Sequence, residues 1–126
     1  MKSARAAALA TALALSALTL VACQQSAEVS RAVGAMCDEK AECDERCMPP
    51  DALTPGGFCT LSCLNDGDCP ADTRCADVEG GVCLFACQHD LQCEFLGQDW
   101  GCSEEELLSD DPEEIDEVEV CLGSPQ

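Results

Sequence analysis

The spacing of the cysteines constrains this chain more than any other feature. Thirteen of its 126 residues are cysteine, and twelve of these fall into three similarly spaced sets of four. Five residues separate the first two cysteines of every set, and three residues separate each set from the next. Internal repeats of this kind indicate the architecture before any single motif does. The sets are Cys37, Cys43, Cys47 and Cys59; Cys63, Cys69, Cys75 and Cys83; and Cys87, Cys93, Cys102 and Cys121.

The repeat segment is short and poor in large apolar side chains. It has no tyrosine, and its aromatic residues are three phenylalanines and one tryptophan. A chain of this kind buries too little apolar surface to offset its ordering entropy without covalent cross-links. Six disulfides at roughly 2–4 kcal/mol each would supply that stability. The sequence therefore predicts a small disulfide-rich domain over residues 37–121, followed by a tail at 122–126, with repeats at 37–59, 63–83 and 87–121.

The sequence leaves the pairing of the cysteines open. Confined to their own sets, the twelve cysteines allow 3 × 3 × 3 = 27 pairings. We favour the first cysteine with the third and the second with the fourth, for example Cys63 with Cys75 and Cys69 with Cys83. The spacings are also compatible with zinc ligands, but the leader described next predicts export, and cysteines of an exported protein pair in an oxidising compartment. We therefore expect disulfides and neither a metal nor a cofactor.

The first 22 residues have the pattern of a secretory signal peptide. Lys2 and Arg5 form a basic head, and an uncharged run rich in Ala and Leu follows from Ala6 to Val21. Such a run is helical in the precursor and is removed from the mature protein. It is too short and too rich in alanine for a membrane span, which needs about 20 strongly apolar residues.

The end of this leader, Leu20-Val21-Ala22-Cys23, resembles the lipobox of bacterial lipoproteins. The resemblance implies cleavage before Cys23, a diacylglyceryl group on its thiol and an acyl chain such as palmitate on its amine. Two or three acyl chains anchor a protein firmly to a membrane. Lipidation of Cys23 would also explain the odd cysteine count. The residue that follows, Gln24, implies an outer-membrane anchor in the cell envelope, facing the periplasm or the cell surface.

Between Cys23 and the first repeat, residues 24–36 are small and polar and are expected to form a flexible tether. Within the repeats, turn signals alternate with short apolar runs. Gly80-Gly81 predicts a tight reversal before a strand at Val82–Phe85, and Gly56-Gly57 predicts the same in the first repeat. We therefore expect short β-hairpins, turns and little other regular structure. Asp66 and Asp90 occupy equivalent places, where an Asx-type turn is expected.

The last repeat contains an acidic loop, Ser103 to Val120, with ten acidic residues and no basic one. The patterns Ser103-x-x-Glu106 and Asp111-Pro112-Glu113-Glu114 are compatible with two short helices, followed by an extended return through Val118. We expect a solvated surface element whose deletion would leave stability unchanged. Loose calcium binding and a basic partner remain alternatives.

The formal charge of −19 becomes −21 when Lys2 and Arg5 leave with the leader, because 25 acidic and 4 basic residues remain. This charge excludes nucleic acid as a partner. The chain has a single histidine, His89, in a polar loop, and no nucleophile is paired with a base. We therefore expect a protein that is not an enzyme.

The run Cys63-x-x-Asp66-x-Asp68-Cys69-Pro70-x4-Cys75 resembles the core of whey-acidic-protein domains, the Dickkopf N-terminal region and repeats in cysteine-rich bacterial lipoproteins. The resemblance implies a disulfide-stapled binding or structural module, with a protein or polysaccharide ligand at the cell surface. Whey-acidic-protein domains have an adjacent Cys-Cys pair that this chain lacks. The first function we expect is a non-catalytic, lipid-anchored envelope lipoprotein. The alternatives are a secreted-type protease inhibitor and a loose calcium-binding surface protein.

Overall fold

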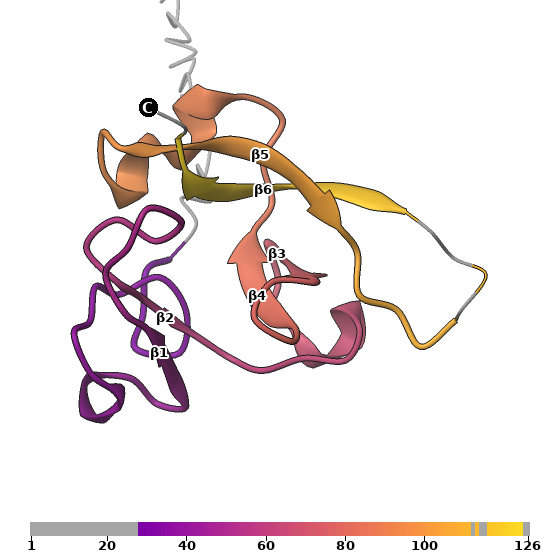
Figure 1. Ribbon diagram of the computed structural model, residues 1–126, viewed down its shortest axis with the longest axis horizontal. Helices are drawn as coiled ribbons and strands as arrows, with labels where there is room; N and C mark the ends of the chain where they lie inside the picture. Colours follow the sequence, from indigo (N-terminus) through magenta and orange to yellow (C-terminus); the bar gives the residue numbers. More distant parts are fainter. Residues whose placement is uncertain (1–27, 112, 114–115, 125–126) are drawn as a thin grey trace, which may run out of the picture.

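The computed structural model describes residues 28–111, 113 and 116–124, so the leader and Cys23 lie outside the described residues. Each repeat consists of a 3₁₀ helix followed by a two-stranded antiparallel hairpin (Figure 1). Within the described residues, no helix is long and apolar enough to cross a membrane. The elements are η1 (Lys40–Glu42), β1 (Arg46–Met48) and β2 (Phe58–Thr60) in repeat one; η2 (Asp66–Asp68), β3 (Thr73–Ala76) and β4 (Val82–Phe85) in repeat two; and η3 (Asp90–Leu96), β5 (Trp100–Glu106) and β6 (Glu117–Gly123) in repeat three.

Every hairpin places the third and fourth cysteines of its set directly opposite each other. The first cysteine of each set lies three residues before the 3₁₀ helix, and the second lies directly after it or, in repeat three, within it. These two cysteines bridge to the two strands. The expected pairing of first with third and second with fourth is confirmed in all three sets. The bridges are Cys37–Cys47, Cys43–Cys59, Cys63–Cys75, Cys69–Cys83, Cys87–Cys102 and Cys93–Cys121.

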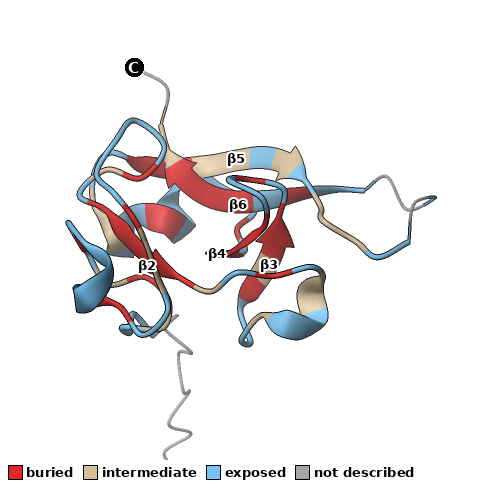
Figure 2. Cartoon of the chain, turned by 60° about the horizontal axis from the view of Figure 1, so that its bottom comes forward, coloured by how far each residue is buried: buried red, intermediate tan, exposed pale blue. Residues whose placement is uncertain are grey.

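The three repeats share one hydrophobic core, which is larger than the sequence predicted. Phe58 of repeat one lies between Phe85 of repeat two and Trp100 of repeat three, with ring centroids 6.1 Å and 5.4 Å away. Figure 2 shows the buried segments of β2, β3, β4 and β6 converging on the centre of the molecule. Each repeat has too few apolar residues for a core of its own. They pack together because each hairpin turns its apolar side chains toward the other two.

The short extended segment that precedes each cysteine set pairs with the last strand of the hairpin in that set. The N–H of Cys59 donates to the carbonyl oxygen of Ala35, and the N–H of Cys83 donates to that of Leu61, at 2.8 and 3.1 Å. The part of the expected tether from Ser30 to Ala35 is therefore fixed to the domain, and Val33 is buried. The flexible tether predicted for residues 24–36 was wrong for this part, because these residues complete the hairpin of repeat one.

The acidic segment of repeat three forms the longest of the three hairpins, β5–β6. The helix predicted to begin at Ser103 was wrong, because Ser103–Glu106 pair with residues 117–120 as strand. In this strand the exposed Glu104 and Glu106 alternate with the partly buried Ser103 and Glu105. The second helix start lies partly outside the described residues. Leu107 and Leu108 are half-buried against repeat two, and the N–H of Leu108 donates to the carbonyl oxygen of Cys75 at 3.0 Å. The predicted tail was also wrong at Leu122, which is buried in β6.

Candidate binding sites on the repeat scaffold

The twelve cysteines act as a covalent framework. In each repeat, the sulfur atoms of three cysteines lie within 4.8 Å of one another. Zinc binds cysteine as the thiolate, and a sulfur atom that is bonded to a second sulfur offers no thiolate. The geometry therefore reflects two stacked disulfides in each repeat. Cys23, the predicted lipidation site, lies outside the described residues.

A second feature shared by the repeats is a hydrogen bond that closes the turn between the first two cysteines. The backbone N–H after the first cysteine donates to the side chain of the residue before the second cysteine. In repeat one, N–H groups of Asp38 and Glu39 lower the pKa of the Glu42 carboxyl below its ordinary value, because they stabilise its charged form. The three bonds join Asp38 to Glu42, Leu64 to Asp68 and Gln88 to Gln92.

Asp66 and Asp90 are equivalent residues that attach the 3₁₀ helix to the hairpin. The Oδ1 atom of Asp66 accepts the backbone N–H of Cys75 at 2.8 Å, and Oδ1 of Asp90 accepts that of Cys102 at 2.9 Å. The Oδ2 atom of Asp66 also accepts Nε–H of Arg74 at 2.8 Å. The expected Asx-type turn at Asp66 was therefore wrong. The neighbouring Asn65 forms it instead, through a bond to Gly67.

Repeat one departs from this pattern, because Lys40 stands in the place of Asp66 and Asp90. A hollow of about 290 Å³ lies at this position. The hollow therefore contains two cationic side chains in a strongly acidic chain. Its lining residues are Lys40, Glu45, Arg46, Cys47 and Ser62.

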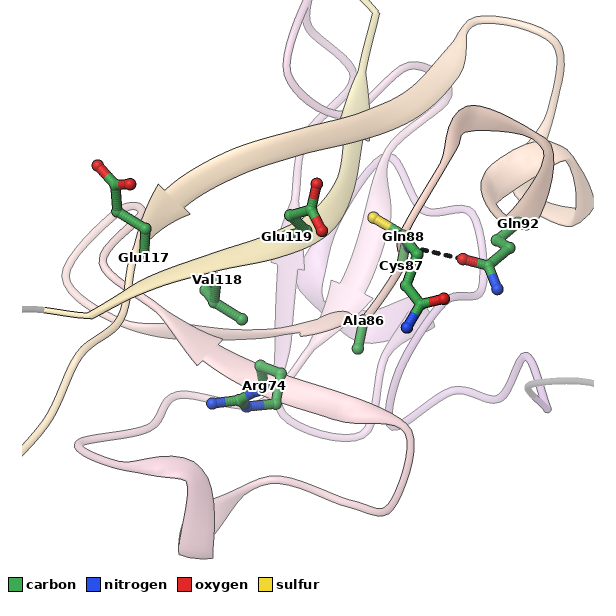
Figure 3. A pocket seen from close by; sticks show the side chains of 8 residues that line it. All are labelled: Arg74, Ala86, Cys87, Gln88, Gln92, Glu117, Val118 and Glu119. Carbon is green, nitrogen blue, oxygen red and sulfur yellow. Dashed lines mark hydrogen bonds between the residues drawn. The ribbon is translucent and has the colours of Figure 1, made fainter.

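A larger hollow of about 510 Å³ lies between β3 and β6, beside Arg74 (Figure 3). Figure 3 shows Val118 pointing toward Arg74, whereas the carboxylates of Glu117 and Glu119 point to the other side of β6. The guanidinium of Arg74 is bonded to Asp66. Among the residues that line this hollow, Arg74 is the one cation, and its charge is already neutralised by Asp66. No carboxylate of β6 is paired with it.

A third hollow of about 670 Å³ lies where the loop of repeat one meets the end of β6. Leu53 and Gly123 belong to its wall and are joined by a backbone hydrogen bond of 2.7 Å. Asp99 contributes an exposed carboxylate to the same wall. The hollow lies at the contact between the first and last repeats, where Nε1–H of Trp100 also donates to the carbonyl oxygen of Pro55.

The outer part of the β5–β6 hairpin carries like charges opposite each other. Glu104 pairs with Glu119, and Glu106 pairs with Glu117. A side-chain hydrogen bond to Glu104, with the repulsion from that carboxylate, raises the pKa of Glu117 above its ordinary value. Like charges directly opposite each other destabilise a β-hairpin. The acidic surface expected from the sequence is therefore present, on a strand pair instead of a loop.

The single histidine, His89, is exposed in the turn before η3, as expected for a solvated side chain. Comparisons with protein-family models, with curated proteins and with solved structures found no match. The structure itself shows tandem four-cysteine motifs with six disulfides, which is the coarser part of the resemblance to whey-acidic-protein and Dickkopf modules.

Proposed function

We propose that this protein is a non-catalytic, lipid-anchored lipoprotein of the bacterial envelope that displays a disulfide-stapled binding module. One observation carries the proposal. Every cysteine among the described residues is in a disulfide, so that of thirteen cysteines twelve are bridged and only Cys23 is left. This remaining cysteine stands at the end of the apolar leader, in the lipobox-like sequence Leu20-Val21-Ala22-Cys23.

The position of the folded module relative to Cys23 supports an anchored role. Ser30 is seven residues after Cys23, and its N–H donates to the carbonyl oxygen of Val33. Seven residues span at most about 25 Å, because an extended chain covers roughly 3.3–3.6 Å per residue. A lipid on Cys23 would therefore hold the module within about one domain diameter of the bilayer. Gln24 supports sorting to the outer membrane.

The described surface also supports a role in binding over one in catalysis. A catalytic site needs a nucleophile or acid–base pair in a pocket. Within the described residues, none of the serine hydroxyls that line the three hollows is hydrogen-bonded to a carboxylate or to histidine, so no nucleophile is paired with a base there. The bridged framework instead holds side chains of short turns in fixed positions, which lowers the entropic cost of binding a partner.

Expression of the full chain with Cys23→Ala in a bacterial host tests the anchor. The variant is expected to lose membrane partitioning and globomycin-sensitive processing, while the control Gln25→Ala keeps both. Gln24→Asp tests the sorting, since it is expected to move the protein to the inner membrane. Identical fractionation of Cys23→Ala and the unchanged protein would refute the lipid anchor.

A protease inhibitor is the competing function for a small stapled module. Inhibition assays of the mature chain against serine and cysteine proteases separate the two. We expect no inhibition at equimolar concentrations of protein and protease. Stoichiometric inhibition of any protease would replace the proposed function with that of an inhibitor.

A further inference from the structure

The three repeats provide an internal comparison, because the same backbone position is occupied in two of them and open in the third. Three residues after the first cysteine, repeats two and three place Asp66 and Asp90. Each of these carboxylates accepts the N–H of the third cysteine of its repeat. Repeat one places Lys40 there, and an ammonium group cannot accept a hydrogen bond.

The N–H of Cys47, the third cysteine of repeat one, points away from its partner strand. Cys47 lies opposite Cys59, whose own N–H and carbonyl oxygen bond to Ala35 and Gly34 on the far side of β2. Opposite residues in an antiparallel pair either exchange both hydrogen bonds or neither. The N–H of Cys47 therefore faces outward, and no acceptor among the described residues bonds to it.

Two cationic residues share the hollow of repeat one with Cys47. Arg46 precedes Cys47 as Arg74 precedes Cys75, so the two arginines hold equivalent positions on β1 and β3. In repeat two that guanidinium meets a carboxylate, whereas Arg46 donates Nη2–H to the carbonyl oxygen of Glu79 at 2.9 Å. Lys40 and Arg46 line the hollow of about 290 Å³ together with Cys47.

Glu45, the one acidic residue that lines the hollow, bonds to a different backbone group. The Oε1 atom of Glu45 accepts the backbone N–H of Ser62 at 3.0 Å. Within the described residues, Glu45 forms no ion pair with Lys40 or Arg46. The hollow thus has an unused N–H donor, a guanidinium with free N–H groups and an ammonium group. We name it the repeat-one notch, defined by Lys40, Arg46 and Cys47.

We propose that the repeat-one notch binds a carboxylate of an acidic side chain from a protein partner. The geometry in repeat two is the template: one oxygen of the carboxylate accepts the backbone N–H and the other accepts Nε–H of arginine, each at 2.8 Å. Charge-assisted hydrogen bonds of this kind are stronger than neutral ones. The inference rests on the binding-module part of the proposed function and is independent of Cys23.

A single carboxylate on a protein suits this site better than a polyanion. The mature chain has 25 acidic and 4 basic residues, so an extended polyanion would meet repulsion over most of the surface. One acidic side chain on an otherwise neutral or basic partner avoids that repulsion. Its carboxylate would enter the notch as the carboxylate of Asp66 enters the equivalent position of repeat two.

The notch is tested by following backbone amide signals with nuclear magnetic resonance. The mature chain carrying Cys23→Ala is labelled with ¹⁵N and titrated with N-acetyl-aspartate amide at low salt. The amide signal of Cys47 is expected to shift saturably, with N-acetyl-asparagine amide as the matched neutral probe. Arg46→Gln is expected to weaken binding about tenfold, because it removes a hydrogen bond to a charged group.

Two further variants test the template. Lys40→Asp restores the carboxylate of repeats two and three, so it is expected to raise the melting temperature and to abolish the response of Cys47 to the probe. Asp66→Ala opens the equivalent position of repeat two, where the N–H of Cys75 is then expected to respond. This variant also shows that the probe and the salt conditions suit such a site.

Three outcomes would overturn the proposal. One is a silent Cys47 signal in a titration that shifts Cys75 of the Asp66→Ala variant. Another is unchanged probe binding in Lys40→Asp. A response of Cys47 to a uronic-acid polysaccharide, with none to the aspartate probe, would assign the notch to a polysaccharide. Each of these outcomes leaves the fractionation test of Cys23 unaffected, so failure of the notch is distinguishable from failure of the anchor.

Discussion

Replacing Phe58 by alanine is expected to destabilise the whole domain, although the six disulfides remain intact. Phe58 is fully buried, and it contacts an aromatic ring in each of the other two repeats. Truncating a buried phenylalanine to alanine costs about 3–5 kcal/mol, from lost apolar burial and from the cavity that remains. The two aromatic contacts, worth about 0.5–1.5 kcal/mol each beyond burial, place Phe58 toward the upper end of that range.

Guanidinium unfolding without reductant measures this cost. The fluorescence of Trp100 reports the transition, because its indole is buried and packs on Phe58. A loss of about 4 kcal/mol would remove a large part of the 5–15 kcal/mol that stabilises an ordinary domain. It would also lower the melting temperature by more than about 10 °C in a chain of this size.

The matched control is Leu64→Ala, which truncates a side chain that is 66% exposed. Surface substitutions of this kind change stability by less than about 0.5 kcal/mol. A shared core also requires that Trp100 fluorescence in repeat three and circular dichroism follow one transition. A loss below about 1 kcal/mol for Phe58→Ala, or separate transitions for the two probes, would mean that the disulfides stabilise each repeat independently.

Three further perturbations test other parts of the fold. Gly81→Ala is expected to lower the melting temperature far more than Gly80→Ala. Both glycines have positive φ, but a Cβ at Gly81 would lie 2.3 Å from the carbonyl oxygen of Cys63, whereas a Cβ at Gly80 would have no atom within 4 Å. Equal losses of stability in the two variants would contradict the predicted clash at Gly81. The pKa of Glu117 is raised above 4.5 by Glu104, so the stability tied to this group is fully present below 4.5 and is lost as pH rises through the raised pKa. Glu117→Gln should remove this pH-dependent loss of stability. A variant whose stability has the same pH profile as the unchanged protein would refute the contribution of Glu117. Deletion of residues 104–117 should lower the melting temperature, because it removes paired residues of both β5 and β6. An unchanged melting temperature would instead support the dispensable surface loop expected from the sequence.

The cysteine spacing predicted the architecture because a disulfide can join only cysteines whose α-carbons come within about 7 Å. Short, repeated spacers leave few ways to satisfy that condition three times. The glycine pairs before β2 and β4 then predicted where each chain reversal occurs. A Cβ at Gly57 would lie 1.7 Å from the carbonyl oxygen of Cys37, so the position requires glycine.

The sequence failed where long-range packing decides the structure. Leu107, Leu108 and Val118 are few among ten acidic residues. The extended return through Val118 was predicted, but the helix-start pattern at Ser103 concealed the strand that pairs with it. These side chains are half-buried or buried because β5–β6 packs across repeat two. The pairing of Ala35 with Cys59 was missed as well. Leu61 holds the equivalent position two residues before Cys63, and its pairing with Cys83 was likewise not indicated by local patterns.

The sequence did not show that Lys40 occupies the place of Asp66 with a different role, because that role depends on a contact between residues that are distant in the sequence. Only the structure shows that Asp66 accepts the N–H of a residue nine positions later. With that bond known, the difference between the three repeats can be interpreted. In repeat one, no described residue accepts the N–H of Cys47, and a second cationic residue, Lys40, lines the same hollow. Repeats two and three use a carboxylate there to attach helix to hairpin. The same scaffold position therefore serves stability in two repeats, and in repeat one it is left open to a carboxylate from another molecule.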